Sequence, residues 1–429
     1  MYRPVDVIEV RVWDRTVGAV ALDPKLGFYA FEYDPAFARS GIELAPLTMP
    51  LSAAREPFVF PALPERTWLR LPALLADALP DDFGNALVDA WMSRHGVARS
   101  AITPLDRLAY MGKRGLGALE FRPARSPAIT SATAIKLSEL VESARLAVRG
   151  DLGSDPHAAA ALTQLIRVGT SAGGARAKAV IAWNPTTDEI RPGQFEVAEG
   201  FEHWLLKFDG LGPDPELGSS QDYGRIEYAY HLMATAAGIT MSPCRLLEEH
   251  GRAHFMTKRF DRTGNRKHHL QTLCAMSHLD YRQKATHDAA QLFQTLAQLQ
   301  LDHAAVDESF RRLAFNIMSA NCDDHTKNTS FLLRENEAWQ LAPAYDLTHA
   351  FNPKGEWTHQ HLLGVNGKFT GIAREDLLNL ADRFAIGAAP RLMKEVAAAV
   401  AAWPDFAARA GVGEAEMARI RGDHRLLKG

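Results

Sequence analysis

The stretch Asp323-Asp-His-Thr-Lys-Asn328, followed by Asp346, constrains the fold of this chain more than any other part of the sequence. Asp323 and Asn328 are five positions apart, and Asp346 comes eighteen positions after Asn328. In this spacing one carboxylate can face a nucleophilic hydroxyl, while an amide oxygen and a second carboxylate hold magnesium on nucleotide phosphates. The pattern is typical of a protein-kinase catalytic loop. Such a loop requires further nucleotide-binding groups, which we expect in the segments that precede it.

A glycine-rich segment, Val168-Gly-Thr-Ser-Ala-Gly-Gly-Ala-Arg-Ala-Lys-Ala-Val180, comes first in chain order. Glycines let the backbone approach a phosphate closely and turn its N–H groups inward. We predict that this loop binds the nucleotide phosphates through Gly173, Gly174, Ala175, Arg176 and Lys178. It is not a Walker A loop, because Gly-Lys-Ser/Thr does not follow. An ordinary turn is the alternative.

A lysine inside an apolar strand and a glutamate on the next helix form the second pair of candidates. Lys207 lies in His203-Trp-Leu-Leu-Lys-Phe208, where a lysine is costly unless it is paired. In kinases such a lysine binds the α- and β-phosphates and a helix glutamate, a role that Glu227 on the predicted helix 225–236 could fill. The alternatives are an edge strand whose lysine reaches solvent and a merely solvated glutamate.

The remaining candidates lie on the next strand and on the catalytic loop. We expect the strand Phe255-Met-Thr-Lys-Arg-Phe260 to contact adenine, with Lys258 and Phe260 as candidates. On the loop, His325 is a further cofactor-binding candidate, and Lys327 could offset charge on the transferred phosphoryl group. Asp323 would accept the hydroxyl proton, and Asn328 and Asp346 would bind Mg²⁺. The pair His359 and His361 could bind zinc, although two histidines alone are weak support.

Composition limits the remaining possibilities. The 429 residues exceed one ordinary domain, and 47% apolar with 23% charged residues suit a globular enzyme. The net charge of −3 provides no overall attraction to nucleic acid or membranes. Three scattered cysteines fit a reducing compartment. An early charge argues against a signal peptide, and no apolar run is long enough to span a membrane. We therefore expect a cytoplasmic protein without membrane contact.

Periodicity predicts the other elements. Alternating apolar residues over 5–33 indicate an antiparallel meander, and helical spacing over 68–97 is interrupted at Pro80. Gly112, Gly115 and Gly117 indicate a tight loop before a strand. Residues 122–133 have the composition of a linker, and the mildly basic tail 418–428 is typical of a solvated helix end.

The chain resembles the HipA-type serine/threonine kinases, which are the toxins of HipA/HipB-like type II toxin–antitoxin pairs. The resemblance rests on Ser171-Ala-Gly-Gly-Ala-Arg-Ala-Lys178, Lys207 in its strand, Asp323-Asp-His-Thr-Lys-Asn328 and Ala342-Pro-Ala-Tyr-Asp-Leu347. Similar segments in the N-terminal part extend it over nearly the whole chain. It implies an α+β, two-lobed protein-kinase-like fold with an additional N-terminal β-rich subdomain and a mainly helical C-lobe. The implied domains are a subdomain over 1–125, a kinase N-lobe over 126–262 and a C-lobe over 263–429.

The resemblance also implies a function and its control. It assigns Asp323 as the catalytic aspartate, and ATP and Mg²⁺ as cofactors. Ser171 corresponds to the family's autophosphorylated serine, whose modification silences the kinase, and the neighbouring Thr170 offers a second hydroxyl. The implied partners are a small helix-turn-helix antitoxin (HipB-like), which would bring DNA contact indirectly, and a translation-related protein substrate such as an aminoacyl-tRNA synthetase. Two other functions stay open: a small-molecule phosphotransferase, and a catalytically idle subunit of a DNA-bound repressor complex.

Overall fold

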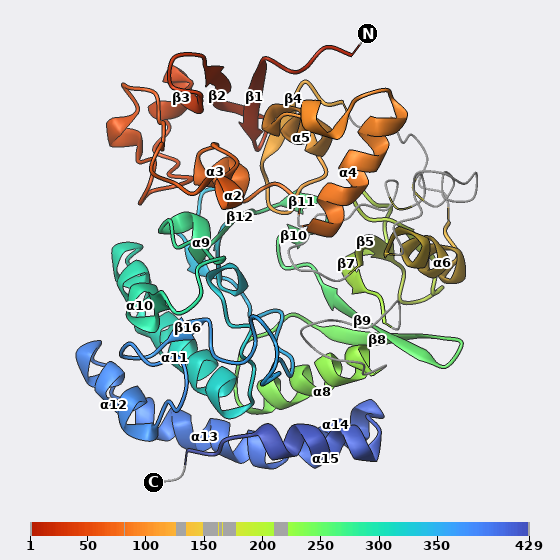
Figure 1. Ribbon diagram of the computed structural model, residues 1–429, viewed down its shortest axis with the longest axis vertical. Helices are drawn as coiled ribbons and strands as arrows, with labels where there is room; N and C mark the ends of the chain where they lie inside the picture. The colour runs from red at the N-terminus through yellow and green to blue at the C-terminus, as the bar shows by residue number, and fades with distance from the viewer. Residues whose placement is uncertain are drawn as a thin grey trace. The chain divides into compact units, whose positions relative to one another are not determined.

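The computed structural model describes residues 2–80, 82–125, 134–148, 162, 165, 177–209 and 222–427, and divides the chain into two compact units (Figure 1). The first unit comprises Met1–Leu211, Thr257–Gln271 and Leu332–Ala338. The second comprises Gly212–Met256, Thr272–Phe331 and Trp339–Gly429. Each unit is therefore assembled from three separate stretches of chain. The domain boundaries predicted above remain predictions.

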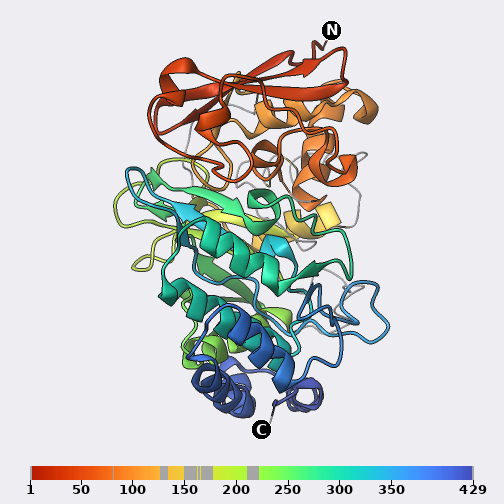
Figure 2. The same ribbon diagram turned by 90° about the vertical axis from the view of Figure 1, so that its left-hand side faces the viewer.

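The first unit begins with a four-stranded antiparallel sheet in the order β3-β2-β1-β4. Its strands are β1 (Val7–Val12), β2 (Arg15–Asp23), β3 (Phe28–Tyr33) and β4 (Glu120–Arg122). Alternate residues of β1, namely Ile8, Val10 and Val12, are buried, because successive side chains point to opposite faces of a sheet. The predicted meander is thus confirmed. In Figure 2 the red strands of this sheet form a layer beside the orange helices of the same unit.

Several short helices follow the meander. They are α1 (Pro35–Ala38), η1 (Leu51–Ala53), α2 (Glu65–Trp68), α3 (Ala73–Ala76), α4 (Asp82–Arg94), η2 (Arg99–Ala101), α5 (Pro104–Met111) and α6 (Leu137–Val148). The helical pattern over 68–97 is broken at Pro80, as predicted, and also at Pro72, which caps α3. Helix α5 starts from a capping box between Thr103 and Asp106 and packs on β1 and β4. The predicted loop follows, with Gly112 and Gly117 at positive φ before β4.

The first unit also contains the strands that carry the predicted nucleotide-binding lysines. Strands β5 (Lys178–Trp183), β6 (Ile190–Pro192) and β7 (Glu202–Lys207) pair antiparallel, with β5 between the other two. The bounds of β7 confirm the strand that was predicted at 203–208. A short hairpin, β10 (Arg262–Thr263) with β11 (Arg266–Lys267), completes the unit.

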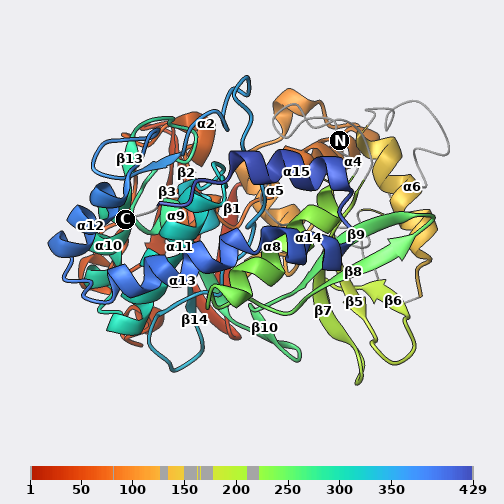
Figure 3. The ribbon, with the colours of Figure 1, turned by 90° about the horizontal axis from the view of Figure 1, so that it is seen from below.

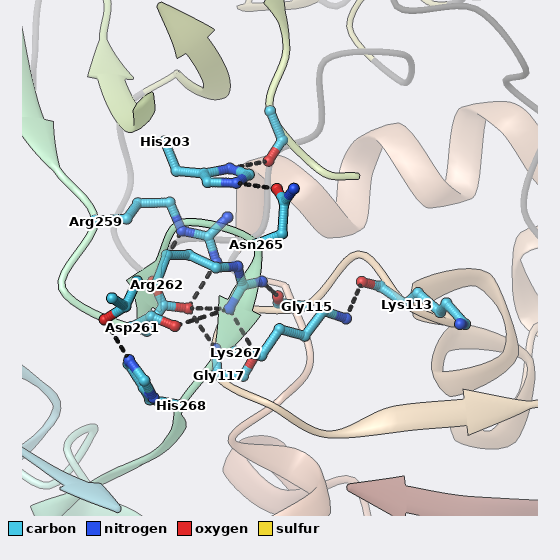
Figure 4. A network of polar contacts seen from close by, with 12 residues as sticks. Lys113, Gly115, Gly117, His203, Arg259, Asp261, Arg262, Asn265, Lys267 and His268 are labelled. Carbon is cyan, nitrogen blue, oxygen red and sulfur yellow. Dashed lines mark hydrogen bonds and ion pairs between the residues drawn. The ribbon is translucent and has the colours of Figure 1, made fainter. Parts of the chain in front are cut away.

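A buried network of charges ties this hairpin to the loop before β4 (Figure 4). Asp261 receives hydrogen bonds from Arg259 at 2.9 and 2.6 Å, from Arg262 at 3.0 Å and from the Gly117 N–H at 2.7 Å. Burial alone would raise the pKa of Asp261, but the two guanidinium charges and these hydrogen bonds hold it well below its ordinary value. Lys267 donates to the Lys113 carbonyl at 2.9 Å. The network therefore joins two stretches of the first unit that are far apart in sequence.

The second unit is mainly helical. Its helices are α8 (Tyr223–Ala236), α9 (Leu273–Met276), α10 (Ala289–Gln298), α11 (His303–Met318), η3 (Thr326–Asn328), α12 (Arg374–Arg383), α13 (Ala389–Ala401), α14 (Trp403–Ala410) and α15 (Glu414–Asp423). Helix α13 packs on α11 and α8, and α14 packs on α8, as the view in Figure 3 shows. The predicted helix 225–236 is confirmed as α8. Among the residues described, no helix is long and apolar enough to cross a membrane.

The strands of the second unit are short. They are β8 (Cys244–Glu249), β13 (His287–Asp288), β15 (Gln340–Leu341) and β16 (Leu363–Gly364), and β13 pairs parallel with β16. Three further strands, β9 (Arg252–Lys258), β12 (His269–Thr272) and β14 (Ser330–Leu333), carry the chain from one unit into the other.

The basic residues Arg419, Arg421 and Arg425 of the C-terminal tail are exposed, as the predicted solvated helix end requires, but other residues of the tail are packed. Ile420 of α15 is completely buried. Beyond the helix, His424 Nε2 lies 3.1 Å from the Tyr230 hydroxyl, and the Arg425 N–H donates to the Met318 carbonyl at 2.9 Å. Asp423 bonds His349 at 3.0 Å. The tail is thus bound to segments on both sides of the predicted catalytic loop, because its apolar and polar contacts outweigh the cost of ordering it.

Candidate functional site

The predicted catalytic loop has an alternating pattern of burial. Cys322, Asp324 and Thr326 are 4%, 4% and 2% exposed, whereas Asp323, His325 and Lys327 between them are only partly buried. Alternate residues of an extended segment point to opposite sides, so one set faces the core and the other faces outward. Asp323 and His325 therefore lie on the partly exposed side of the loop, and Lys327, in the η3 turn that follows, is also partly exposed.

The inward residues hold the loop in place. Thr326 donates its hydroxyl hydrogen to the Leu279 carbonyl at 2.7 Å, and the Cys322 N–H donates to the Ala350 carbonyl at 3.0 Å. Asp324 bonds His361 at 2.8 Å. Buried polar groups with this many partners fix a backbone segment, since leaving any one of them unpaired is costly.

The outward residues have the exposure that a reacting group requires. The Asp323 side chain is 48% exposed, and its Oδ1 lies 3.7 Å from His325 Nε2. The Lys327 ammonium lies 4.8 Å from the centre of the Tyr281 ring, which is within the range of a cation–π contact. The adjacent carboxylates thus differ in surroundings: the Asp324 side chain is almost completely buried, whereas the Asp323 side chain is about half exposed.

Asn328 and Asp346, the predicted magnesium ligands, are both conformationally defined. The Asn328 amide nitrogen donates to the Asp323 carbonyl at 2.6 Å, which turns its amide oxygen to the other side. Asp346 has φ of 53°, in the left-handed region that aspartate tolerates better than most residues and that often occurs at functional sites. Tyr345, just before it, donates its hydroxyl to the Lys327 carbonyl at 2.6 Å and so links the two motifs.

These residues fit magnesium in the kind of donors they offer. An amide oxygen and a carboxylate are hard ligands, and Mg²⁺ typically takes only one or two such groups from a protein, with water and phosphate oxygens completing its shell. In the part of the chain that the structure describes, no group of three or more His, Cys, Asp or Glu side chains could hold a metal by itself. The zinc alternative for His359 and His361 is not supported, since His359 bonds the Gly355 carbonyl at 3.0 Å and His361 bonds Asp324.

Glu227 lies on α8 of the second unit and is only 2% exposed. A carboxylate is rarely buried to this extent unless it is paired. The alternative of a merely solvated helix charge is therefore wrong. Its pairing with Lys207 stays a prediction.

In the first unit, Lys178 and Lys207 stand directly opposite each other on β5 and β7. Directly opposed residues of an antiparallel pair project to the same face with their Cβ atoms about 5 Å apart. Lys178 is only 2% exposed, and Lys207 is half-buried. Lys178 and Lys207 thus bring two positively charged side chains to one face of the sheet. Their binding of a nucleotide phosphate stays a prediction.

Strand β7 is not an edge strand with a lysine reaching into water. It pairs with β5 along one side, and the Arg259 N–H donates to the His203 carbonyl at 2.9 Å. Lys258, a predicted adenine contact, binds Glu202 at 2.5 Å at the end of the same strand. Phe260 lies half-buried in the turn that follows β9. The structure thus places both residues beside β7 and leaves their adenine contact a prediction.

The other predicted residues lie outside the described part of the chain. They are Thr170, Ser171, Gly173, Gly174, Ala175 and Arg176. Sequence reasoning also missed residues that shape the loop, namely Tyr281, Asp324, Tyr345 and His361. The run Cys322-Asp-Asp-His-Thr-Lys327 has no apolar–polar alternation that would have singled out Asp324 as the buried carboxylate. No local pattern indicated the other three.

Comparison with known proteins identifies the chain. Residues 170–404 match the model of the HipA-like C-terminal domain, and residues 8–122 match that of the HipA N-terminal domain. Among solved structures, a chain from the Shewanella oneidensis MR-1 toxin–antitoxin complex of HipA, HipB and operator DNA is similar. It has 16% sequence identity and a TM-score of 0.67, and the match covers 97% of this chain and 95% of that one. At this identity the likeness shows the fold alone.

Two further comparisons provide no support for a particular function. The Helicobacter pylori proinflammatory kinase CtkA matches with 13% identity and a TM-score of 0.33, over 52% of this chain and 88% of that one, which is too weak to support an argument. No curated protein matches this chain. The fold is that of a two-lobed, kinase-like protein of mixed α and β structure, as predicted. The chain belongs to the HipA family, whose two domain models together span most of its length.

Proposed function

We propose that this protein is an ATP- and Mg²⁺-dependent protein serine/threonine kinase that acts as the toxin of a toxin–antitoxin pair. The outward face of the catalytic loop carries the proposal, because it combines a half-exposed Asp323 with a firmly held backbone. Phosphoryl transfer needs mainly positioning and charge neutralisation, and these are the properties of the loop. The opposed lysines of β5 and β7 support a nucleotide as the phosphate donor.

Each residue has a role in the proposed reaction. Lys178 and Lys207 bind phosphate oxygens of ATP, and Asn328 and Asp346 hold the metal. Magnesium supplies the positive charge that neutralises the phosphates. Asp323 accepts the proton of the acceptor hydroxyl as that oxygen bonds to phosphorus and the bond to the ADP oxygen breaks. Lys327 offsets negative charge on the transferred group.

The family relationship supports the finer parts of the proposal. The protein substrate would belong to the translation machinery, with an aminoacyl-tRNA synthetase as the candidate, and autophosphorylation at Ser171 or Thr170 would silence the kinase. The solved Shewanella oneidensis complex contains HipB and operator DNA, which supports a HipB-like antitoxin as the partner here. All three cysteines, which lie in the described residues, form no disulfide, as suits the cytoplasm.

Mass spectrometry of the purified protein with Mg-ATP tests the proposal. We expect phosphate on Ser171 or Thr170 in the wild type and in Asp405→Asn, which changes an exposed carboxylate away from the site, but not in Asp323→Asn. Ser171→Ala and Thr170→Ala then distinguish the two hydroxyls. Equal labelling of wild type and Asp323→Asn would refute the catalytic role.

The wider function needs cell-based measurements. Expression of the wild type should arrest growth, and Asp323→Asn should not. Labelled ATP added to a cell lysate should mark a protein; label found only in the low-molecular-weight fraction would favour the small-molecule phosphotransferase. Co-expression of a helix-turn-helix protein encoded beside this chain should relieve the arrest.

A further inference from the structure

One imidazole contacts both neighbours of Asp323. His361 Nδ1 lies 2.8 Å from Asp324 Oδ2, and His361 Nε2 lies 3.9 Å from Cys322 Sγ. Cys322 precedes Asp323 in the chain and Asp324 follows it. The two nitrogens of a single ring thus hold the residues on either side of the proposed catalytic aspartate.

The contact between His361 and Asp324 is strong. Both side chains are buried, at 10% and 1% exposure. Burial alone would lower the pKa of His361, but the negative charge and hydrogen bond of Asp324 raise it to about 10. The ring is therefore protonated at neutral pH, so each of its nitrogens carries a hydrogen to donate, and a charge-assisted hydrogen bond of this kind is about twice as strong as a neutral one.

The second oxygen of Asp324 binds backbone. Asp324 Oδ1 accepts the N–H groups of Leu362 at 2.7 Å and of Leu363 at 3.2 Å. This segment is itself anchored: the His361 N–H donates to the Phe369 carbonyl at 2.9 Å, and β16 pairs with β13. Hydrogen bonds thus hold the catalytic loop against the segment 361–364, which lies about 40 residues further along the chain.

We propose that His361 is a positioning residue that, through Asp324 and Cys322, sets the direction in which Asp323 faces the acceptor hydroxyl. The inference rests on the proposed kinase function, since it concerns the same loop. Its physical basis is the alternation of the loop: when residues 322 and 324 are held inward, the side chain between them must project outward. Without the His361 ring the loop keeps its backbone hydrogen bonds and the Leu362 and Leu363 N–H groups on Asp324 Oδ1, but Asp324 Oδ2 and Cys322 lose their common partner and Asp323 is held less firmly.

The test compares His361→Gln with His254→Gln. The control residue is also a buried histidine of the second unit beside a carboxylate, with His254 Nε2 3.8 Å from Glu249, but it lies on the β8–β9 hairpin. His361→Gln should lower kcat about 100-fold, the size expected when a reacting group is displaced by about 1 Å. The KM for Mg-ATP should not change, since no phosphate-binding group is altered. His254→Gln should keep the wild-type kcat.

A second measurement does not depend on turnover. Amide hydrogen exchange of residues 321–325 should become faster in His361→Gln and in Cys322→Ala, while exchange in α11 and α13 stays as in the wild type. Free imidazole added to His361→Ala should restore part of the lost kcat.

The outcomes separate the inference from the proposed function. If the wild type transfers no phosphate, the kinase proposal fails, and the hydrogen-exchange comparison still decides the positioning role. If the wild type is active and His361→Gln retains its kcat, the positioning role fails alone. Equal losses of kcat and folded protein in both glutamine variants would also overturn it, because they would indicate general destabilisation.

Discussion

Replacing Asp261 by asparagine should destabilise the first unit severely. This carboxylate lies at the centre of the network in Figure 4, where it is 3% exposed and accepts hydrogen bonds from Arg259, Arg262 and the Gly117 N–H. Asparagine has nearly the same shape but no charge. Two buried guanidinium groups would then face each other without the anion that neutralises them, and the amide nitrogen would add a donor where only acceptors fit.

The magnitude follows from the burial of the network. Removing one partner of a buried ion pair costs about 3–5 kcal/mol, because the remaining charge is left uncompensated. We expect the upper part of this range, since two arginines rather than one lose their partner; burial already lowers the pKa of Arg262 to about 10. A loss of this size is a large fraction of the total stability of an ordinary domain.

Urea unfolding at pH 7, followed by circular dichroism and by hydrogen exchange in β1 and β4, measures the effect. Asp6→Asn is the matched control, because Asp6 pairs with Arg3 at 3.6 Å on the surface and should contribute almost nothing. A loss below about 1 kcal/mol for Asp261→Asn would refute the argument that buried charge organises this junction.

A related prediction concerns how the free energies of unfolding of the wild type and of Asp261→Asn depend on pH. The folded-state pKa of Asp261 lies below its unfolded value of 3.8, so its contribution to stability is present above pH 3.8 and is lost as the pH falls below that value. The difference in unfolding free energy between wild type and Asp261→Asn should therefore shrink in acid. A difference that grows as the pH falls would contradict the assignment.

Three further predictions concern the site and its supports. Because the pKa of His361 is raised from 6.5 to about 10, the stability difference between wild type and His361→Gln should be full below pH 6.5 and disappear as the pH rises through 10, as measured by urea unfolding across this range. Lys207→Met should weaken ATP binding about 10- to 100-fold in calorimetry, the loss of one charge-assisted hydrogen bond, while Lys25→Met on an exposed turn should not. A chain that ends at Gly422 loses the three tail hydrogen bonds and should be about 2–4 kcal/mol less stable, whereas a chain that ends at Arg425 should match the wild type.

The sequence predicted the features that depend on local patterns. The meander was predicted because burial in a sheet alternates every second residue, and Asp323, Asn328 and Asp346 were identified because their chemistry needs a set spacing. Features that depend on contacts between distant residues were not predicted. The His361 ring reaches Asp324 across 37 positions, and His424 reaches Tyr230 across 194, and neither contact leaves a local signature. The exposed basic residues of the tail were predicted, but the burial of Ile420 and the contacts of His424 were not.

The discontinuity of the two units has a consequence for how such a protein can be divided. The first unit needs the stretch 257–271, which carries Asp261, in addition to everything before residue 211. No single cut in the chain therefore releases either unit whole. A single cut between 212 and 256 would break the covalent link between the stretch 257–271 and the part of the first unit that precedes residue 211, and one genetic crossover could not exchange either unit between relatives. Recombination or proteolysis at a single position would therefore disrupt a unit instead of separating the two units.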